Sequence, residues 1–477
     1  MIKLLDFWKK YSEIIVLSIL AVFVTITFFV KEFSMVILFF VFAVTMFLKT
    51  ESIFYMIIFL FPFQVVYSYP MAGLVYAILM IGLFGIIKNY IVDIMKYKKK
   101  ISWNIYLVFA ILLVYIIIIP KIKDSSIFMH FVMKSVLAIF AYEYRDKLSF
   151  VKIIEIFALS LIMSGVMWLF RIHSEILYSY EFLYNGIIKL TGGFEHPNIF
   201  CFYNIITISG LLFCFYKKQI SVQKFLIYFL GCFIFGHLAI SRNFALNFVI
   251  TILIFFIMLL IRDGLKSLKF ILPFTAVIIL ICLLMFDTTN KLFLHVGNVY
   301  EFDELTSKWD FLEKYYNEIM AGQKKYDPGR FGLWYTYLRF FLDNPICIFI
   351  GRGYGNFLIG QTPPHNIVLS HLYYFGLIGC LIFAVFVLML HGGIKLKNIF
   401  KYSEVFLMLV PYWLFLALNP LLYDMMLVPI LLFAKVQNNE FKKDDKQEMY
   451  EMIEENKYQR NIIIKLKKLK LEKSSKK

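Results

Sequence analysis

Long, unbroken apolar segments recur along almost the whole of this 477-residue chain. They constrain its fold more than any other feature. A helix needs about 20 apolar residues to cross a bilayer, whereas the strands of a spanning β-barrel alternate apolar and polar residues over about ten positions. The segments here are continuous, so they predict helices. The composition agrees, since 61% of the residues are hydrophobic and only 17% are charged, which is typical of membrane proteins.

We therefore predict an all-α fold, a polytopic transmembrane helix bundle of about fourteen spans. Several segments are shorter than a full crossing, so the boundaries and the number of spans stay open. The predicted spans are 14–30, 34–48, 53–69, 72–92, 101–120, 127–141, 151–170, 199–216, 225–239, 244–261, 270–286, 367–390, 405–417 and 421–433.

Four regions follow from this assignment. Residues 1–286 hold the first eleven spans, 287–366 form a large extracytoplasmic loop with short helices, 367–434 hold the last three spans, and 435–477 are a basic cytoplasmic tail. Within the tail, 458–471 fits an amphipathic helix on the inner leaflet and a solvated basic segment equally well.

The formal charge of +17 is concentrated in the connections between spans and in the tail. If the N-terminus is cytoplasmic, the inside loops hold most of the lysines and arginines, as the positive-inside rule requires. Both termini are then cytoplasmic, in a bacterial inner membrane, and the basic residues contact anionic lipid headgroups rather than nucleic acid. The short outside loops hold little beyond Lys31, Lys121, Lys123, Arg171, Lys189 and Arg242.

Three polar clusters lie at predicted outer ends of spans, where polar groups in a membrane protein are informative because burying them in lipid is costly. Residues 191–198 open the eighth span, 241–243 form the turn between the ninth and tenth, and 362–366 open the twelfth. Topology alone is expected to bring these clusters to one depth of the membrane.

The large loop adds two further segments. Residues 327–345 carry Arg330 and Arg339 among many aromatic residues, a pattern typical of a helix in the headgroup layer. Residues 351–357 contain Arg352 with Gly353 and Gly355. Closely spaced glycines allow backbone N–H groups to approach a phosphate, although this signal is weak by itself.

Arg242, Arg330 and His365 together indicate a reaction at a phosphorylated lipid. Guanidinium groups stay charged and bind phosphate through two hydrogen bonds, so two of them can hold a diphosphate and stabilise it as it leaves. A histidine near such cations is biased toward its neutral form and can accept a proton from an attacking hydroxyl. We expect contacts to the diphosphate or substrate from Arg352, Arg339, His196, Asn198, Asn366, Gly353 and Gly355.

No metal or other cofactor is expected. The outer segments contain no DxD-type pair of carboxylates, and the six cysteines are scattered without the spacing of a metal knuckle or a redox motif.

These residues resemble a family pattern. The similar segments are Gly193-Phe-Glu-His-Pro-Asn198, Ser241-Arg242, Arg330-x-x-x-Trp334, Asn344-Pro345, Gly351-x-Gly-x-Gly355-x-Phe357, and His365-Asn366 through Gly376-x-x-Gly379. In this order, they resemble the bacterial O-antigen polymerases and O-antigen ligases. The resemblance covers roughly Thr191 to Gly379, and the first seven helices match only in character. One departure is Tyr374-Phe375, which stands where many members carry an acidic residue before the glycine.

The resemblance implies a fold similar to that of the C-type membrane glycosyltransferases. It also implies transfer of a glycan from an undecaprenyl diphosphate carrier to an acceptor hydroxyl on the periplasmic or outer face, without a metal. A polymerase uses the non-reducing end of another lipid-linked repeat unit as acceptor, whereas a ligase uses the lipid A core. We favour the polymerase, since polymerases also serve capsules and exopolysaccharides. A chain-length regulator and a flippase are the expected protein partners.

Other interpretations stay open for several of these residues. An arginine or histidine at a helix end often serves only as an interfacial anchor. His196 and Asn198 also fit a helix start beside Pro197. For His130 and Lys134, on one face of the sixth span, a headgroup contact or snorkelling is favoured over catalysis. Asp424, within the last span, is an alternative base.

A flippase for the same lipid-linked sugars is the non-enzymatic alternative. It predicts charged residues deep in the bundle and repeated halves.

Overall fold

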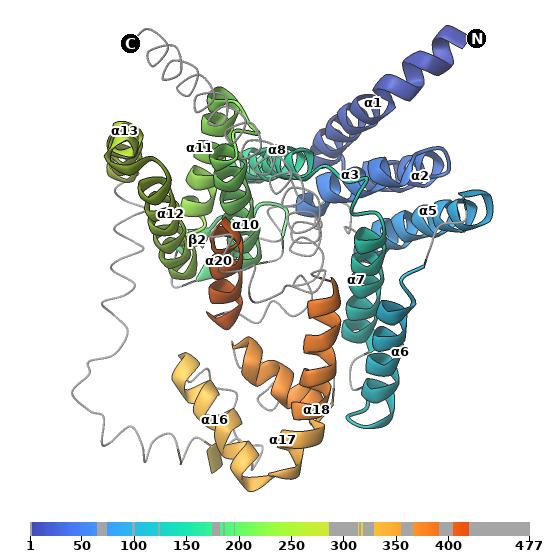
Figure 1. Cartoon of the computed structure of the whole chain (residues 1–477), viewed down its shortest axis with the longest axis vertical. Helices are drawn as coiled ribbons and strands as arrows, with labels where there is room; N and C mark the ends of the chain where they lie inside the picture. Colours follow the sequence, from blue (N-terminus) through green and yellow to red (C-terminus); the bar gives the residue numbers. More distant parts are fainter. Residues whose placement is uncertain are drawn as a thin grey trace, which may run out of the picture.

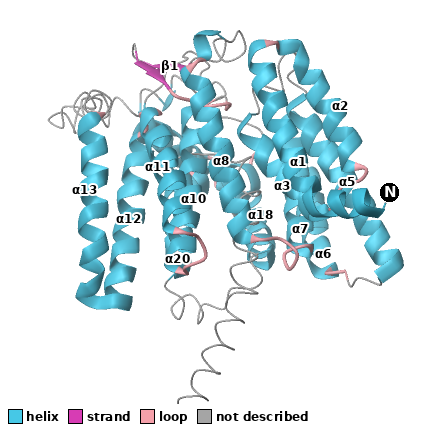
Figure 2. Cartoon of the chain, turned by 90° about the horizontal axis from the view of Figure 1, so that it is seen from above, coloured by secondary structure: helices cyan, strands magenta, loops and turns pink. Residues whose placement is uncertain are grey.

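The computed structural model of the protein is mostly helical (Figure 1). It describes residues 2–63, 74–97, 101–122, 125–173, 182–184, 187–194, 196–285, 313, 316–317, 329–353, 366–390 and 404–418. Many of the helices run side by side along one common direction (Figure 2). A short two-stranded hairpin lies at one end of these helices (Figure 2).

The first half of the chain forms seven of the described helices. They are α1 (Ile2–Phe29), α2 (Ser34–Thr45), α3 (Thr50–Leu60), α5 (Leu74–Tyr97), α6 (Trp103–Ile118), α7 (Ser125–Glu143) and α8 (Phe150–Leu169). Short 3-10 turns extend three of the connections: η1 (Lys31–Phe33), η2 (Phe61–Phe63) and η3 (Arg171–His173).

The antiparallel strands β1 (Phe182–Tyr184) and β2 (Ile187–Lys189) separate this half from the rest. The helices that follow are α10 (Pro197–Tyr216), α11 (Val222–Leu238), α12 (Arg242–Asp263) and α13 (Leu268–Leu284), with η4 (Gly264–Ser267) between the last two. Beyond them lie α16 (Gly329–Asp343), α17 (Ile346–Ile350), α18 (Ile367–Leu390) and α20 (Glu404–Leu418).

Six helical segments are long and apolar enough to cross a membrane: Ser12–Phe29, Ala77–Lys96, Phe150–Leu169, Pro197–Tyr216, Arg242–Leu284 and Ile367–Leu390. Shorter apolar helices accompany them. The protein is thus a membrane-embedded helical bundle. The spans predicted from the sequence overlap helices where the structure describes them. Residues 64–69 of the third span, 72–73 of the fourth and the whole of 421–433 lie outside the described residues. The number of crossings and the extent of the large loop stay predictions.

Helix α10 is the centre of its half of the bundle. It contacts α8, α11, α12 and α20, and 83% of its length is buried inside the protein. By contrast, α12 and α13 expose large apolar side chains along one side, among them Val249, Leu253 and Leu280. Apolar side chains in such number are stable against lipid and unfavourable in water. The two patterns place α10 in the protein interior and α13 at the lipid boundary.

Capping residues fix where several helices begin. Ser149, Ser221 and Ser241 each precede a helix, and each hydroxyl accepts a hydrogen bond from the backbone N–H three residues later. Such a cap satisfies one of the N–H groups that a helix start leaves without an intrahelical partner. The starts of α8, α11 and α12 are therefore determined by local sequence.

Helix α18 changes direction at Gly376, where the backbone is not helical (φ 64°, ψ 178°). At this kink the chain crosses Gly351 so closely that a Cβ on Gly376 would lie 2.4 Å from the backbone nitrogen of Gly351. The hydroxyl of Tyr115, on α6, donates to the carbonyl oxygen of Phe375 at 2.7 Å. The kink thus joins α6, α17 and α18 at one point.

Candidate functional site

The segment before α10 is packed tightly against two other parts of the bundle. The Ser164 hydroxyl of α8 accepts a hydrogen bond from the backbone N–H of Gly193 at 2.7 Å and donates one to the carbonyl oxygen of Pro62 at 3.2 Å. Gly192 has a positive φ of 59°. A Cβ on Gly193 would lie 2.2 Å from the oxygen of Pro62. The two glycines therefore set the path of the chain into α10.

His196 and Asn198 occupy the start of α10 and both take part in hydrogen bonds. His196 is the N-cap, and its Nδ1 accepts from the backbone N–H of Asn198 at 3.0 Å. The hydroxyl of Ser241 donates to Oδ1 of Asn198 at 3.0 Å. Two of the three polar clusters expected from the sequence, 191–198 and 241–243, are thus in direct contact. The helix-start role considered for His196 is present in the structure.

Two cations lie at this end of the bundle. Arg242 is exposed at the first position of α12, and Lys189 is partly buried at the end of β2. Burial lowers the pKa of the Lys189 ammonium below its ordinary value; the neighbouring Cys201 opposes this shift, and the positive charge of Arg242 adds a smaller lowering effect. Two positive charges close enough to influence each other are favourable beside an anion and unfavourable without one.

The helix starts add to this positive potential. Both α10 and α12 begin here, and each helix carries about half a positive charge at its N-terminus. At the start of α10, Pro197 has no N–H and the N–H of Asn198 already bonds to His196, so this helix contributes through its dipole rather than through direct N–H contacts. Asn243, one residue into α12, donates to the carbonyl oxygen of Phe415 at 3.2 Å. This bond also fixes α20 against the site. The arrangement suits a phosphate or diphosphate at the membrane surface.

The described part of the large loop contains a network of aromatic and charged side chains around Arg339. Arg339 forms ion pairs with Glu313 at 3.4 Å and with Asp343 at 4.0 Å. Tyr335 donates to Glu313 at 3.1 Å, and Tyr316 donates to Asp343 at 2.5 Å. Burial, together with the bond to Asp343, raises the pKa of Tyr316 to about 12. Arg339 thus has carboxylate partners, and its contact with a diphosphate stays a prediction.

Arg352 and Gly353 lie where α17 meets the kink of α18. The Arg352 side chain is exposed, while its backbone N–H donates to the carbonyl oxygen of Tyr373 at 2.7 Å. Gly353 is buried and has a φ of 125°, which favours glycine. Tyr374 and Phe375, the departure from the family pattern, are buried. The described start of the glycine-rich segment 351–357 therefore packs against α18, independently of any contact with phosphate.

The remaining predicted site residues are only partly placed. His365 and Gly355 lie outside the described residues, and so does Asp424. Arg330 is the second residue of α16. Asn366 precedes α18, and its Oδ1 accepts hydrogen bonds from the backbone N–H groups of Val368 at 2.9 Å and Leu369 at 3.1 Å. Asn366 is therefore a capping residue at the start of the helix that follows His365.

Lys134, for which the sequence favours a headgroup contact or snorkelling, is buried in α7 (6% exposed). Among the described residues, no group of three or more His, Cys, Asp or Glu side chains is arranged to hold a metal ion. The six cysteines are buried or partly buried: Cys201, Cys214, Cys232, Cys282, Cys347 and Cys380.

Comparison of the chain with family models, with curated proteins and with solved structures gives no match in any of the three. The functional argument therefore depends on the motifs in the sequence and on the geometry of the site.

Sequence reasoning identified Arg242 but did not include Lys189 in the site. The two residues are 53 positions apart, and the hairpin that carries Lys189 has no distinct pattern in the sequence. The one available signal was that Lys189 is among the few cations of the short outside loops.

Proposed function

We propose that this protein is a membrane-embedded glycan polymerase for an O-antigen, capsule or exopolysaccharide. It transfers a growing glycan from undecaprenyl diphosphate to the non-reducing-end hydroxyl of a lipid-linked repeat unit. The observation that carries the proposal is the polar contact between the starts of α10 and α12, where His196, Asn198 and Ser241 are hydrogen-bonded. Two cations accompany it, Arg242 at the start of α12 and Lys189 at the end of β2. Two cations and two helix N-termini suit the diphosphate of such a donor.

In this proposal Lys189 and Arg242 bind the diphosphate and stabilise the negative charge that develops as it leaves. The bond between the anomeric carbon and the diphosphate oxygen breaks, and the acceptor hydroxyl forms the new glycosidic bond. His365 accepts the proton of that hydroxyl, with Arg330 as a second guanidinium on the donor. No metal takes part. The site faces the periplasmic or outer side of the inner membrane, and both chain termini are cytoplasmic.

The order of motifs in the sequence supports a transferase over a flippase. A flippase needs charged residues along a path through the bundle. Lys134, buried in α7, is one such residue, whereas Arg242, His196 and Asn366 lie at helix starts. The ligase alternative differs only in its acceptor, the lipid A core. Chain elongation by a polymerase is expected to involve a separate chain-length regulator, and the flippase is a distinct partner that delivers the substrate.

The test uses purified full-length protein in liposomes with its lipid-linked repeat unit, and the products are separated on a gel. A polymerase gives a ladder that His365→Ala abolishes and that Lys189→Gln and Arg242→Gln reduce. Lys224→Gln is the matched control, since Lys224 is exposed at the other end of α11 and pairs with Glu155. It should leave the ladder unchanged.

Three other results would contradict the proposal. Transfer only when lipid A core is added identifies a ligase. Movement of the lipid-linked unit across the bilayer without elongation identifies a flippase. Equal ladders from wild type and from Arg242→Gln would show that the cationic pair does not bind the donor.

A further inference from the structure

A second cationic site lies at the other end of α12. This helix has 22 residues, so its ends are about 33 Å apart, which is close to the thickness of the hydrocarbon core. Arg242 begins the helix, and Arg262 and Asp263 end it. The turn into α13 is therefore at the membrane surface opposite the candidate site, and what it binds is independent of the proposed enzymatic activity.

A surface cleft of about 640 Å³ is formed at this turn, within the range of small-ligand pockets. Its lining combines several charged side chains with apolar ones near the membrane. They are Arg262, Asp263, Lys266, Lys269, Phe270 and Pro273.

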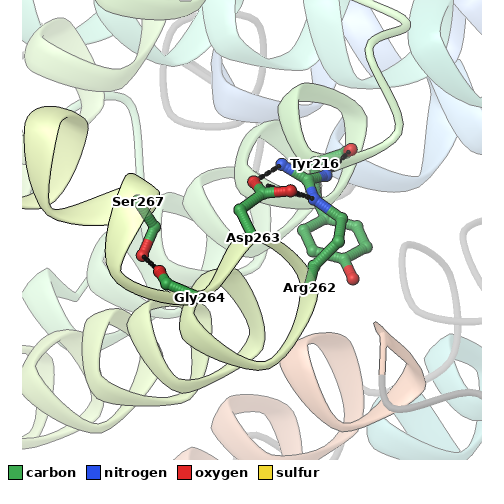
Figure 3. Close-up of polar contacts among 5 residues, drawn as sticks. All are labelled: Tyr216, Arg262, Asp263, Gly264 and Ser267. Atoms are coloured by element: carbon green, nitrogen blue, oxygen red, sulfur yellow. Dashed lines mark hydrogen bonds and ion pairs between the residues drawn. The ribbon is translucent and has the colours of Figure 1, made fainter.

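The turn is held in a defined shape by polar contacts (Figure 3). Arg262 binds Asp263 with two nitrogens, at 3.0 Å and 2.7 Å, and donates from a third to the carbonyl oxygen of Tyr216 at 2.6 Å. The Ser267 hydroxyl donates to the carbonyl oxygen of Gly264 at 2.7 Å. Because Tyr216 ends α10, these bonds connect the ends of α10 and α12 beside the cleft.

The charges of this cleft are not balanced. Asp263 is its one carboxylate, and Arg262 already pairs with it. Lys218 also acts on Asp263 through its positive charge. Lys266 and Lys269 are exposed, and within the described part of the chain neither forms an ion pair with a carboxylate. The cleft thus presents two lysine ammonium groups that are available to an anion.

The apolar side chains around the cleft indicate which kind of anion it can bind. Ile261, Leu265 and Leu272 are large apolar side chains exposed next to the cleft, and Phe270 and Pro273 form its apolar part. A ligand that carries a phosphate beside hydrocarbon chains matches both parts. Lysines near the ends of membrane helices place their ammonium groups at the depth of phosphates while their methylene chains stay in apolar surroundings.

We propose that the cleft binds the phosphodiester headgroup of an anionic phospholipid, with Lys266 and Lys269 on the phosphate and the acyl chains along Leu265 and Leu272. The Arg262–Asp263 pair positions the turn and makes no net contribution of charge. With a cytoplasmic N-terminus, the lipid belongs to the inner leaflet. A soluble phosphate ester offers the same phosphate but lacks the hydrocarbon that the apolar part requires.

The test is native mass spectrometry of the full-length protein released from detergent micelles. Phosphatidylglycerol and phosphatidylcholine with the same acyl chains are added in equal amounts, and the fraction of protein bound to each is measured. Each lysine near an anionic phosphate strengthens binding by about fivefold, so Lys266→Gln with Lys269→Gln should weaken phosphatidylglycerol binding by roughly 20- to 30-fold. Phosphatidylcholine binding should not change.

Lys49→Gln with Lys96→Gln is the matched control. It removes the same charge from two exposed lysines at other helix connections and should leave the lipid preference intact. The unfolding midpoints of both double variants are measured as well. Values equal to that of wild type would verify that the fold is retained.

Each alternative result would overturn the proposal. Equal binding of the two lipids by wild type, or equal loss in both double variants, would show that the cleft has no specific role. Displacement of phosphatidylglycerol by millimolar glycerol phosphate would identify a soluble phosphate ester as the ligand.

Discussion

Replacing Gly376 by alanine tests the close crossing that shapes α18. Gly376 has φ 64° and ψ 178°, a conformation almost confined to glycine. A Cβ there would also lie 2.4 Å from the nitrogen of Gly351 and 2.4 Å from the carbonyl carbon and oxygen of Phe349. All three are backbone atoms, so no side-chain rotation relieves the contact.

The expected cost has two parts. Backbone strain of this kind costs about 1–3 kcal/mol, and inserting a methyl group into a filled space costs about 1–3 kcal/mol more. Together Gly376→Ala should lower the free energy of unfolding by about 2–6 kcal/mol. Gly264 provides a matched control, since it has a similar backbone conformation (φ 57°, ψ −147°) and nothing within 4 Å of a Cβ. Gly264→Ala should therefore cost the strain alone.

The assay is equilibrium unfolding of the full-length protein in mixed micelles with increasing SDS, followed by circular dichroism and tryptophan fluorescence. Gly376→Ala should unfold at clearly lower SDS than Gly264→Ala. Gly351→Ala obstructs the same crossing from the other side, since its Cβ would lie 2.5 Å from the carbonyl oxygen of Tyr374. Once one alanine has separated the two segments, the second clashes less, so the double variant should cost less than the sum of the singles. Equal midpoints for Gly376→Ala and Gly264→Ala would refute the reasoning, because the crossing would then add nothing to the strain.

Other perturbations probe the site and the helix contacts. Burial is the main cause of the lowered pKa of Lys189, and the charge of Arg242 adds to it. Arg242→Gln should therefore raise that pKa slightly, so that the neutral amine becomes scarcer and Lys189 acylates more slowly at mildly alkaline pH. An unchanged acylation profile by peptide mass spectrometry would count against their proximity. Asn243→Leu removes the donor to α20 and should cost about 1–3 kcal/mol in the same unfolding assay, with a wild-type midpoint arguing against this bond. Tyr115→Phe removes the hydroxyl at the α18 kink and should lower the free energy of unfolding by about 0.5–1.5 kcal/mol. A wild-type midpoint would mean that this bond is absent in micelles. Chain elongation in liposomes should continue when divalent metals are chelated by EDTA, and its loss would argue for a metal-dependent transferase.

Helix positions were predictable from the sequence because they depend on local properties. Apolar segments near the length of a bilayer crossing gave α18 its bounds, Ile367–Leu390, and the serine before α8 and the proline at the start of α10 mark helix starts. The prediction that residues 191–198 and 241–243 lie at one depth followed from topology, since loops on the same side of a membrane share a depth. The bond between Ser241 and Asn198 agrees with it.

The roles of individual side chains were harder to predict from the sequence. Glycines 351 and 376 were recognised as parts of a motif, yet their contact joins segments 25 residues apart. The environment of Lys134 also depends on segments distant in the sequence. Helical spacing placed it on a face with His130, but only the packing of the neighbouring helices shows that it is buried.

The sequence by itself determined that this protein is a membrane-embedded helical bundle, because hydrophobicity and helix length are properties of consecutive residues. It also determined which polar residues stand out against the apolar background. The tertiary structure alone decided that Lys189 lies close enough to Arg242 to lower its pKa, and that Gly376 breaks α18 where Gly351 crosses it. Both depend on distances between segments far apart in the chain, and those distances are set by how the helices pack.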